Sequence, residues 1–183
     1  MAFYLGFLLI GCVGCYELTQ HGLFPAISLA IITLTGMSVL FLGQRLWPYC
    51  QAWRHWKSEI VLDILHSLFS TVGASAVYQA TVIALVFSFA DWSARTIGWQ
   101  IWPDSLSLWI QVPVGLLVAD FGAYWFHRLA HKTPILWRIH ALHHSSEQLY
   151  VLSSGRNHPL NVIGTFTAST FPLVLMGASG DVL

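Results

Sequence analysis

The chain has 183 residues, of which 56% are apolar and only 9% are charged, and eight acids balance eight bases. A soluble domain carries roughly 25% charged residues, so this composition excludes an ordinary water-soluble enzyme and a nucleic-acid binder that relies on a basic face. Nine tryptophans and a mean hydropathy of +0.64 also exclude an unfolded chain. We therefore expect a small integral membrane protein.

Four apolar stretches are long enough to be considered as membrane spans. In chain order they cover residues 2–15 (extendable to 18), 23–42, 60–90 and 108–126. A bilayer needs about 20 helical residues, so the second stretch is close to ideal, and the third must tilt or begin in the interface. A fifth stretch, 162–178, is interrupted by Pro172 and is not counted as a span. The expected fold class is an all-α bundle of about four spans.

Basic residues gather in two connecting segments. Residues 44–59 and 127–158 hold seven of the eight bases, and only Arg95 lies elsewhere. Two expected spans separate these segments, so both lie on one face, which the positive-inside rule makes cytoplasmic. We expect the N-terminus on that face too, in the bacterial inner membrane or the endoplasmic reticulum. Trp102, on the opposite loop, is typical of an interfacial aromatic belt.

Other polar groups near the spans have simpler explanations. Asp63 and His66 lie three residues apart at the start of the third span, and we interpret them as an interfacial polar pair. Cys12 and Cys15 form a C-x-x-C inside the first apolar run, where they lack the polar neighbours of a metal site. Three cysteines in all imply no disulfide framework.

Six of the nine histidines fall between positions 127 and 158. Residues three or four apart share a helical face, so H-x-x-x-H at 127–131 and H-x-x-H-H at 140–144 each present several rings on one side. Pro134 separates the two groups and lets the second helix fold back towards the first. The candidate metal ligands are His127, His131, His140, His143 and His144.

Imidazole chemistry indicates which ions these residues would bind. Neutral imidazole binds iron, zinc, copper and nickel, and five rings exceed what one tetrahedral site uses, which favours two metal ions. The alternative is a set of solvated interfacial histidines. That alternative suits a single histidine better than it suits this spacing.

The same region carries a longer pattern. Residues 120–159 combine Asp120, the pair Tyr124-Trp125, H-R-x-x-H, L-W-x-x-H-x-x-H-H-S and R-x-H-P. In this respect the chain resembles the fatty acid hydroxylase / sterol desaturase superfamily. The resemblance implies a membrane-bound oxidoreductase with a histidine-ligated di-iron centre, which uses oxygen to hydroxylate or desaturate a fatty acyl chain or sterol in lipid biosynthesis. It also implies a lipid substrate from the bilayer, molecular oxygen and a reduced electron carrier as partners, with zinc as a possible ion in isolated protein.

One departure from the family pattern affects the domain organisation. Family members close the site with later histidines that end in a second H-x-x-H-H, whereas no histidine follows His158 here. We therefore interpret the chain as a fragment or a truncated form. Residues 1–107 would be an N-terminal transmembrane region, and residues 108–183 the start of the catalytic domain, with its histidines in a cytoplasmic helical cap.

Two further residues are candidates for the site. The resemblance places a histidine at position 158, so His158 is a possible ligand; the alternative is a loop residue held by the turn at Pro159. Asp120 lies seven residues before His127 on the same helical face. Its carboxylate could accept the second ring N–H of a ligand histidine, or it could pair with Arg128.

Two other functions stay open. One is a truncated, inactive protein that binds metal only partially. The other is a non-catalytic metal-binding or transport protein. A transporter should carry ionisable residues through the depth of its spans, and the middles of the second to fourth expected spans almost lack them.

Overall fold

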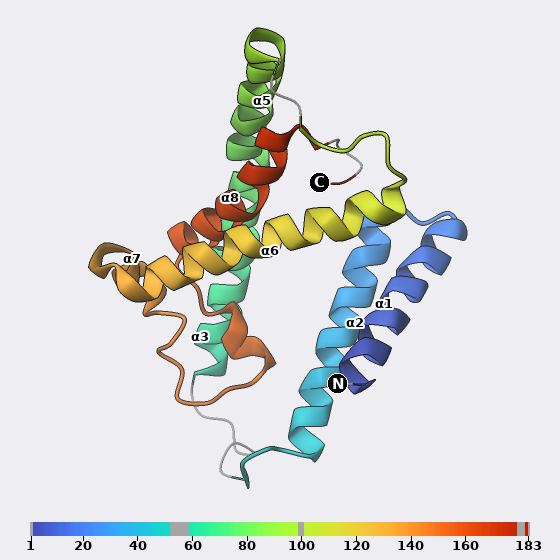
Figure 1. Cartoon of the computed structure of the whole chain (residues 1–183). Coiled ribbons are helices and arrows are strands. Elements are labelled where there is room, and N and C mark those ends of the chain that lie inside the picture. The colour runs from blue at the N-terminus through green and yellow to red at the C-terminus, as the bar shows by residue number, and fades with distance from the viewer. Residues whose placement is uncertain (1, 52–58, 99–100, 179–181, 183) are drawn as a thin grey trace. The chain divides into compact units, whose positions relative to one another are not determined.

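The computed structural model describes residues 2–51, 59–98, 101–178 and 182, and every regular element in this part of the chain is helical (Figure 1). The expected all-α fold is thus confirmed. Two elements are π-helical, η2 and η3, and η4 is a short 3-10 turn. The elements are α1 (Ala2–Gln20), α2 (Pro25–Leu46), α3 (Ile60–Leu65), η2 (His66–Gly73), α4 (Ala74–Val77), η3 (Tyr78–Val82), α5 (Ile83–Ile97), α6 (Leu108–Lys132), α7 (Pro134–His140), η4 (Val151–Gly155) and α8 (Pro159–Met176).

Four helical stretches are long and apolar enough to cross a membrane: Ile27–Leu46, Ile60–Phe89, Leu108–Lys132 and Pro159–Met176. Three coincide with expected spans. The fourth differs from the expectation, because α8 continues through Pro172 to reach 18 residues. The first apolar stretch forms α1, a further helix of 19 residues. Many large apolar side chains on these helices are exposed, as expected for surfaces that face lipid rather than water.

The chain divides into two compact units. The first comprises Met1–Lys57 with Gln148–Val151, and the second comprises Ser58–Glu147 with Leu152–Leu183. In the first unit α1 packs on α2. A Cβ added at Gly14 of α1 would lie 2.8 Å from the terminal methyl group of Ile32 in α2, so the two helices approach closely at this position. The sequence-based division at residue 107 remains a prediction.

In the second unit, the other helices pack on α8. This helix contacts α6, α7 and the η2–α5 part of the long helix of residues 60–97 (Figure 1). The closest approach is at Gly122 of α6, where an added Cβ would lie 1.9 Å from the carbonyl oxygen of Ala168 in α8. Similarly, a Cβ added at Gly164 of α8 would lie 2.3 Å from the nearest ring carbon of Phe126 in α6. Small residues allow membrane helices to approach this closely.

A small core lies where the first half of α6 contacts the end of α8. Trp102, which is 4% exposed, packs with Leu173 and Ala178. Its indole N–H donates to the side-chain oxygen of Gln111 at 2.7 Å, and its backbone N–H donates to the carbonyl of Met176 at 2.7 Å. Trp102 is thus buried in the protein with its indole N–H satisfied by Gln111, and its expected position at the membrane interface remains a prediction.

The Gly122 contact makes a direct prediction about stability. Gly122→Ala should lower the free energy of unfolding by about 1–3 kcal/mol, because the new methyl group overlaps a backbone carbonyl that cannot turn away. Gly43→Ala in α2 is the matched control, since nothing lies within 4 Å of its added carbon. Detergent-purified protein would be unfolded by SDS titration and followed by circular dichroism. Equal unfolding free energies for the two variants would contradict the close α6–α8 contact.

Candidate metal centre

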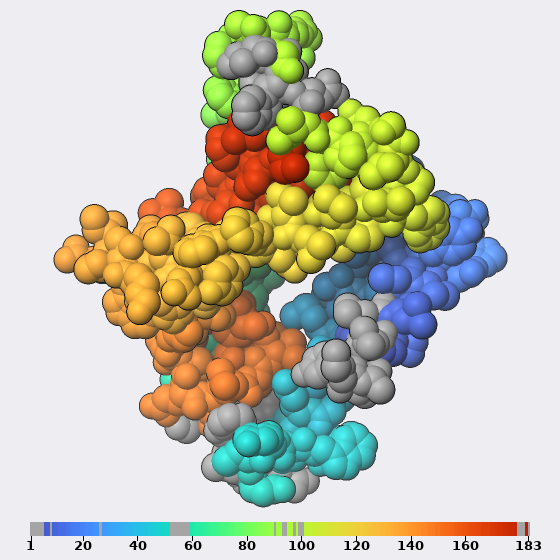
Figure 2. Space-filling model, in the orientation of Figure 1, coloured from blue at the N-terminus to red at the C-terminus, as the bar shows by residue number. Residues whose placement is uncertain are grey.

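Four histidines converge in the second unit. His127 and His131 lie in the last turns of α6, His140 ends α7, and His144 lies in the turn that follows. One ring nitrogen of each lies within 4.8 Å of those of the others. In the space-filling view the end of α6 and α7 lie at the surface (Figure 2), and His140 alone of the four is buried. The group is therefore open to solvent or ligand on one side.

A sharp turn brings the two helices together. Thr133 is extended, with φ −107° and ψ 120°, and Pro134 occupies the first turn of α7. A residue before proline is driven out of the helical region, so α6 ends at Lys132 and the chain changes direction. α7 then packs against the end of α6. The expected fold-back at Pro134 is confirmed.

The spacing of the ring nitrogens fits the coordination of a metal ion. The Nε2–Nε2 distances are 3.2 Å between His127 and His131, 3.3 Å between His131 and His140, and 3.1 Å between His140 and His144. Ligand nitrogens around a tetrahedral ion with bonds of about 2.05 Å are separated by about 3.3 Å. Nε2 of His131 and Nε2 of His140 each take part in two of these contacts. A neutral ring nitrogen has either one proton or one lone pair, so it cannot make two full hydrogen bonds. A metal ion accepts all four lone pairs.

A neighbouring amide fixes the tautomer of His140, which is 2% exposed. Its Nδ1 lies 3.1 Å from Oδ1 of Asn161 in α8. The Asn161 amide nitrogen donates to Asn157 Oδ1 at 3.1 Å, which leaves Oδ1 of Asn161 to accept the proton on Nδ1. The lone pair of His140 is then on Nε2, the atom that faces the other histidines. Asn161 was missed from the sequence because it is 21 residues away; a polar residue in the first turn of an apolar helix was the available signal.

His143 lies beside the group of four rather than in it. Its ring centre is 5.2 Å from that of His144 and 5.7 Å from that of His140. Its Nδ1 is buried and has no hydrogen-bond partner among the residues that the structure describes. A buried nitrogen without a partner is costly, and a bound ion would satisfy it. The structure thus brings four of the five expected ligands together and places the fifth next to them.

The local environment favours the neutral form of His140, His143 and His144. Burial lowers the pKa of His140, His143 and His144, and neighbouring histidines lower each pKa further. The hydrogen bond with Asn161 opposes this shift at His140, and the polar backbone of Arg156 opposes it at His143. Only neutral imidazole binds metal, so the lowered pKa values favour the ligand form.

The two less direct candidates lie outside the histidine group. His158 is the N-cap of α8, where its Nδ1 accepts the backbone N–H of Leu160 at 3.2 Å. Asp120 is exposed, and its side chain makes no hydrogen bond or ion pair with any described residue. Arg128 instead donates to the hydroxyl of Tyr124 at 2.9 Å. The structure does not bring Asp120 to a histidine ring, and both expected roles remain predictions.

A buried ion pair was not expected from the sequence. Arg156 is 3% exposed and Asp63 is fully buried, and their side chains lie 2.5 Å apart. Glu59 accepts a second contact from Arg156, at 3.0 Å. The expected pairing of Asp63 with His66 is wrong, because the His66 ring contacts Ser70 at 3.2 Å instead. No local sequence pattern indicates the Arg156–Asp63 pair, since 93 residues separate its partners.

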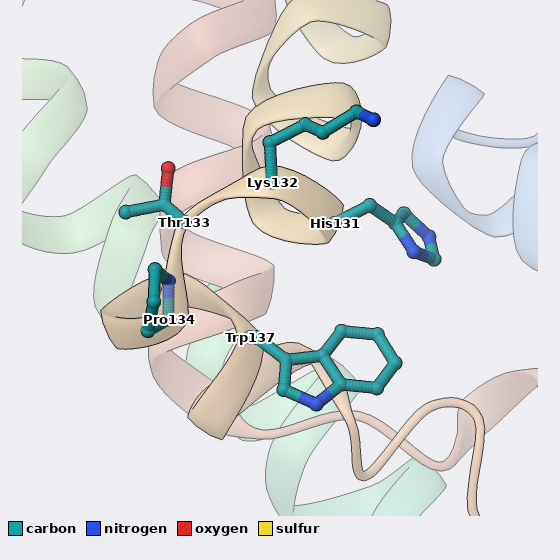
Figure 3. A pocket seen from close by; sticks show the side chains of 5 residues that line it. All are labelled: His131, Lys132, Thr133, Pro134 and Trp137. Carbon is teal, nitrogen blue, oxygen red and sulfur yellow. The ribbon is translucent and has the colours of Figure 1, made fainter.

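A pocket of about 350 Å³ adjoins the histidine group. Its walls are His131, Lys132, Thr133, Pro134 and Trp137. The imidazole of His131, the ammonium group of Lys132 and the indole of Trp137 point to the same side (Figure 3). Because His131 belongs to both the pocket and the histidine group, a molecule in this pocket would lie next to the metal ligands.

Comparison with known proteins identifies similar sequences. Residues 112–183 match the family model described as Fatty acid hydroxylase. The chain is 34% identical over 149 residues to ornithine lipid hydroxylase OlsE of Rhizobium tropici, covering 81% of this chain and 45% of that protein. It is 42% identical over 72 residues to alkylglycerol monooxygenase of Homo sapiens, covering 39% of this chain and 15% of that protein. No solved structure matches the chain.

The chain spans less than half the length of these curated relatives. The family match nevertheless includes every histidine of the converging group, together with His143, Arg156 and Asn161. It therefore covers the part of the molecule in which the candidate metal centre lies. The chain belongs to the fatty acid hydroxylase superfamily.

Proposed function

We propose that this chain is the part of a membrane-bound oxidoreductase that binds iron through histidines and hydroxylates a lipid with molecular oxygen. The observation that carries the proposal is the convergence of His127, His131, His140 and His144 within 4.8 Å in a chain built from apolar helices. Membership of the superfamily and the names of its relatives support a lipid as the substrate. Those names also favour hydroxylation over desaturation.

The chain's own residues would hold and orient the iron. Bound iron supplies the ability to activate oxygen, which no amino-acid side chain provides. The four converging histidines would hold one ion, and Asn161 keeps His140 in the tautomer with a free Nε2 lone pair. The unpartnered nitrogen of His143 makes it the candidate ligand of a second ion, as a di-iron centre requires. Imidazole also accepts zinc, which could replace iron in isolated protein.

The pocket beside His131 is the candidate site for the reacting lipid. Trp137 gives it an apolar wall, and the ammonium group of Lys132 provides a cation at its edge (Figure 3). A carboxylate or other anionic part of a lipid headgroup would be attracted there. Ornithine lipid is the candidate substrate that follows from the relative in Rhizobium tropici.

The distribution of basic residues supports a cytoplasmic location for the centre. The segments 44–59 and 127–158 hold seven of the eight bases, and the long helix 60–97 and α6 separate them. An even number of crossings places both segments on one face, and the positive-inside rule favours the cytoplasm. A reduced electron carrier would then reach the centre from the cytoplasm, while the lipid enters from the bilayer.

Metal content tests the ligand assignment. His140→Ala should weaken iron or cobalt binding by at least about tenfold, because even the partner of a ligand contributes about 10- to 100-fold to affinity. His21→Ala is the matched control, since His21 is exposed and lies outside the group. Metal would be counted by elemental analysis of detergent-purified protein. Unchanged metal binding in a folded His140→Ala variant would remove the basis of the proposal.

Asn161 provides a second, independent test of the site. Asn161→Ala should lower metal affinity by about 10- to 100-fold, since His140 loses the acceptor that fixes its tautomer. Thr165→Ala, one turn further along α8, should leave the affinity unchanged because the Thr165 hydroxyl donates to the backbone carbonyl of Asn161 and not to its side chain. Competition with a chelator of known affinity would measure both. Equal affinities for the two variants would show that Asn161 does not orient His140.

Lipid chemistry tests the reaction itself. Membranes that contain the full-length protein would be supplied with ornithine lipid, a chemical reductant and oxygen gas enriched in a heavy isotope. Mass spectrometry should find one labelled oxygen atom added to the lipid, and none with His140→Ala. A metal-loaded protein that adds oxygen neither to ornithine lipid nor to an alkylglycerol would instead support a metal-binding protein without this activity.

A further inference from the structure

The guanidinium group of Arg156 makes three different contacts. Its Nε lies 2.5 Å from Asp63 Oδ1, and its Nη2 lies 3.0 Å from Glu59 Oε2. Its Nη1 lies 3.4 Å from the hydroxyl of Ser145, the residue after His144. A planar guanidinium can hold three partners in a fixed arrangement, which the single nitrogen of lysine cannot do. Arg156 therefore links the start of α3 to the histidine-bearing loop.

This link stays charged although it is buried. Burial alone lowers the pKa of Arg156, but hydrogen bonds and charge attraction from Asp63 and Glu59 raise it by more. A buried ion pair contributes little net stability compared with apolar side chains of the same volume. Its presence in an otherwise apolar protein therefore points to a role in fixing geometry.

The segment before Arg156 is also fixed to the long helix. An added Cβ at Gly155 would lie 1.9 Å from the hydroxyl oxygen of Ser67 in η2, so the two backbones are in close contact. Thr71 of the same π-helical stretch donates to the carbonyl of Gly155 at 3.3 Å. π-helical turns often occur at functional sites. Gly155 and Arg156 thus lie against a membrane helix rather than in a free loop.

Two short routes lead from Arg156 to the histidines. In the first, the Arg156 guanidinium contacts the hydroxyl of Ser145, which directly follows His143 and His144 in the same loop. In the second, Asn157 follows Arg156 directly and accepts a hydrogen bond from Asn161, which in turn holds His140. Neither route passes through the turn at Pro134, so Arg156 supports the group independently of the α6–α7 turn.

We propose that Arg156, anchored by Asp63 and Glu59, is a positioning residue of the metal centre: it holds the loop of His143 and the start of α8 so that the ligand nitrogens converge. The inference rests on the proposed function, because it concerns the same centre. It assigns to Asp63 and Glu59, which lie more than 60 residues before the nearest ligand, a role in metal affinity.

The test compares two arginine-to-lysine variants of the full chain in detergent. Arg156→Lys keeps a positive charge for Asp63 but cannot hold all three partners, whereas Arg138→Lys changes an exposed arginine of α7. Cobalt(II) would be titrated and followed by its visible absorption, with thermal unfolding measured in parallel. Arg156→Lys should lower cobalt affinity by about 10- to 100-fold at nearly unchanged helix content and unfolding temperature, and Arg138→Lys should leave the affinity unchanged.

A second variant covers the case in which Arg156→Lys does not fold. Asp63→Asn combined with Arg156→Gln removes both buried charges and leaves only Glu59, which is 34% exposed, without its arginine. This double variant should show the same loss of affinity. Wild-type cobalt affinity in either folded variant would overturn the inference. Failure of both variants to fold would also overturn the inference, because the ion pairs would then be required for folding rather than for positioning the ligands. Absence of cobalt binding in the wild-type protein would instead contradict the proposed function.

Discussion

The close contact between α6 and α8 is the constraint on which the rest of the second unit depends. Gly122 and Gly164 allow the two backbones to approach, and the Trp102 core holds the far end of the same contact. Because α8 lies so near α6, its first turn reaches α7 and presents Asn161 to His140. A larger residue at the interface would move α8 away and would separate Asn161 from His140. The packing of α8 on α6 therefore also determines how the ligand His140 is oriented.

The second requirement is that several ring nitrogens meet without protons on the facing atoms. Two of the histidines are one turn apart on α6, so helix geometry alone brings their rings together. The other two come from a second helix that begins at Pro134. Burial and mutual repulsion among the rings favour neutral imidazoles. The hydrogen bond to Asn161 directs the Nε2 lone pair of His140 towards the other rings. Without an ion these contacts leave lone pairs or protons unmatched, which is the physical reason to assign a metal to this place.

Local pattern made much of this structure predictable. The spacing of the histidines, the break at Pro134 and the apolar stretches depend on neighbours in sequence, and the structure agrees with them. The features that were missed depend on distant partners or on context. Asp63 and Arg156 meet across 93 residues, and Trp102 is buried because Gln111 is available to its indole. The stretch 162–178 was not counted as a span because of Pro172, but α8 continues through this proline and packs on several neighbouring helices.

X-ray absorption at the metal edge of the iron-loaded protein tests the central claim most directly. The account predicts a first shell dominated by nitrogen at about 2.1 Å, together with the outer-shell scattering of imidazole rings, about four of them for the ion held by the converging group. Replacing His140 should visibly reduce that outer-shell scattering. A shell of oxygen atoms without imidazole scattering would contradict a histidine-ligated metal centre.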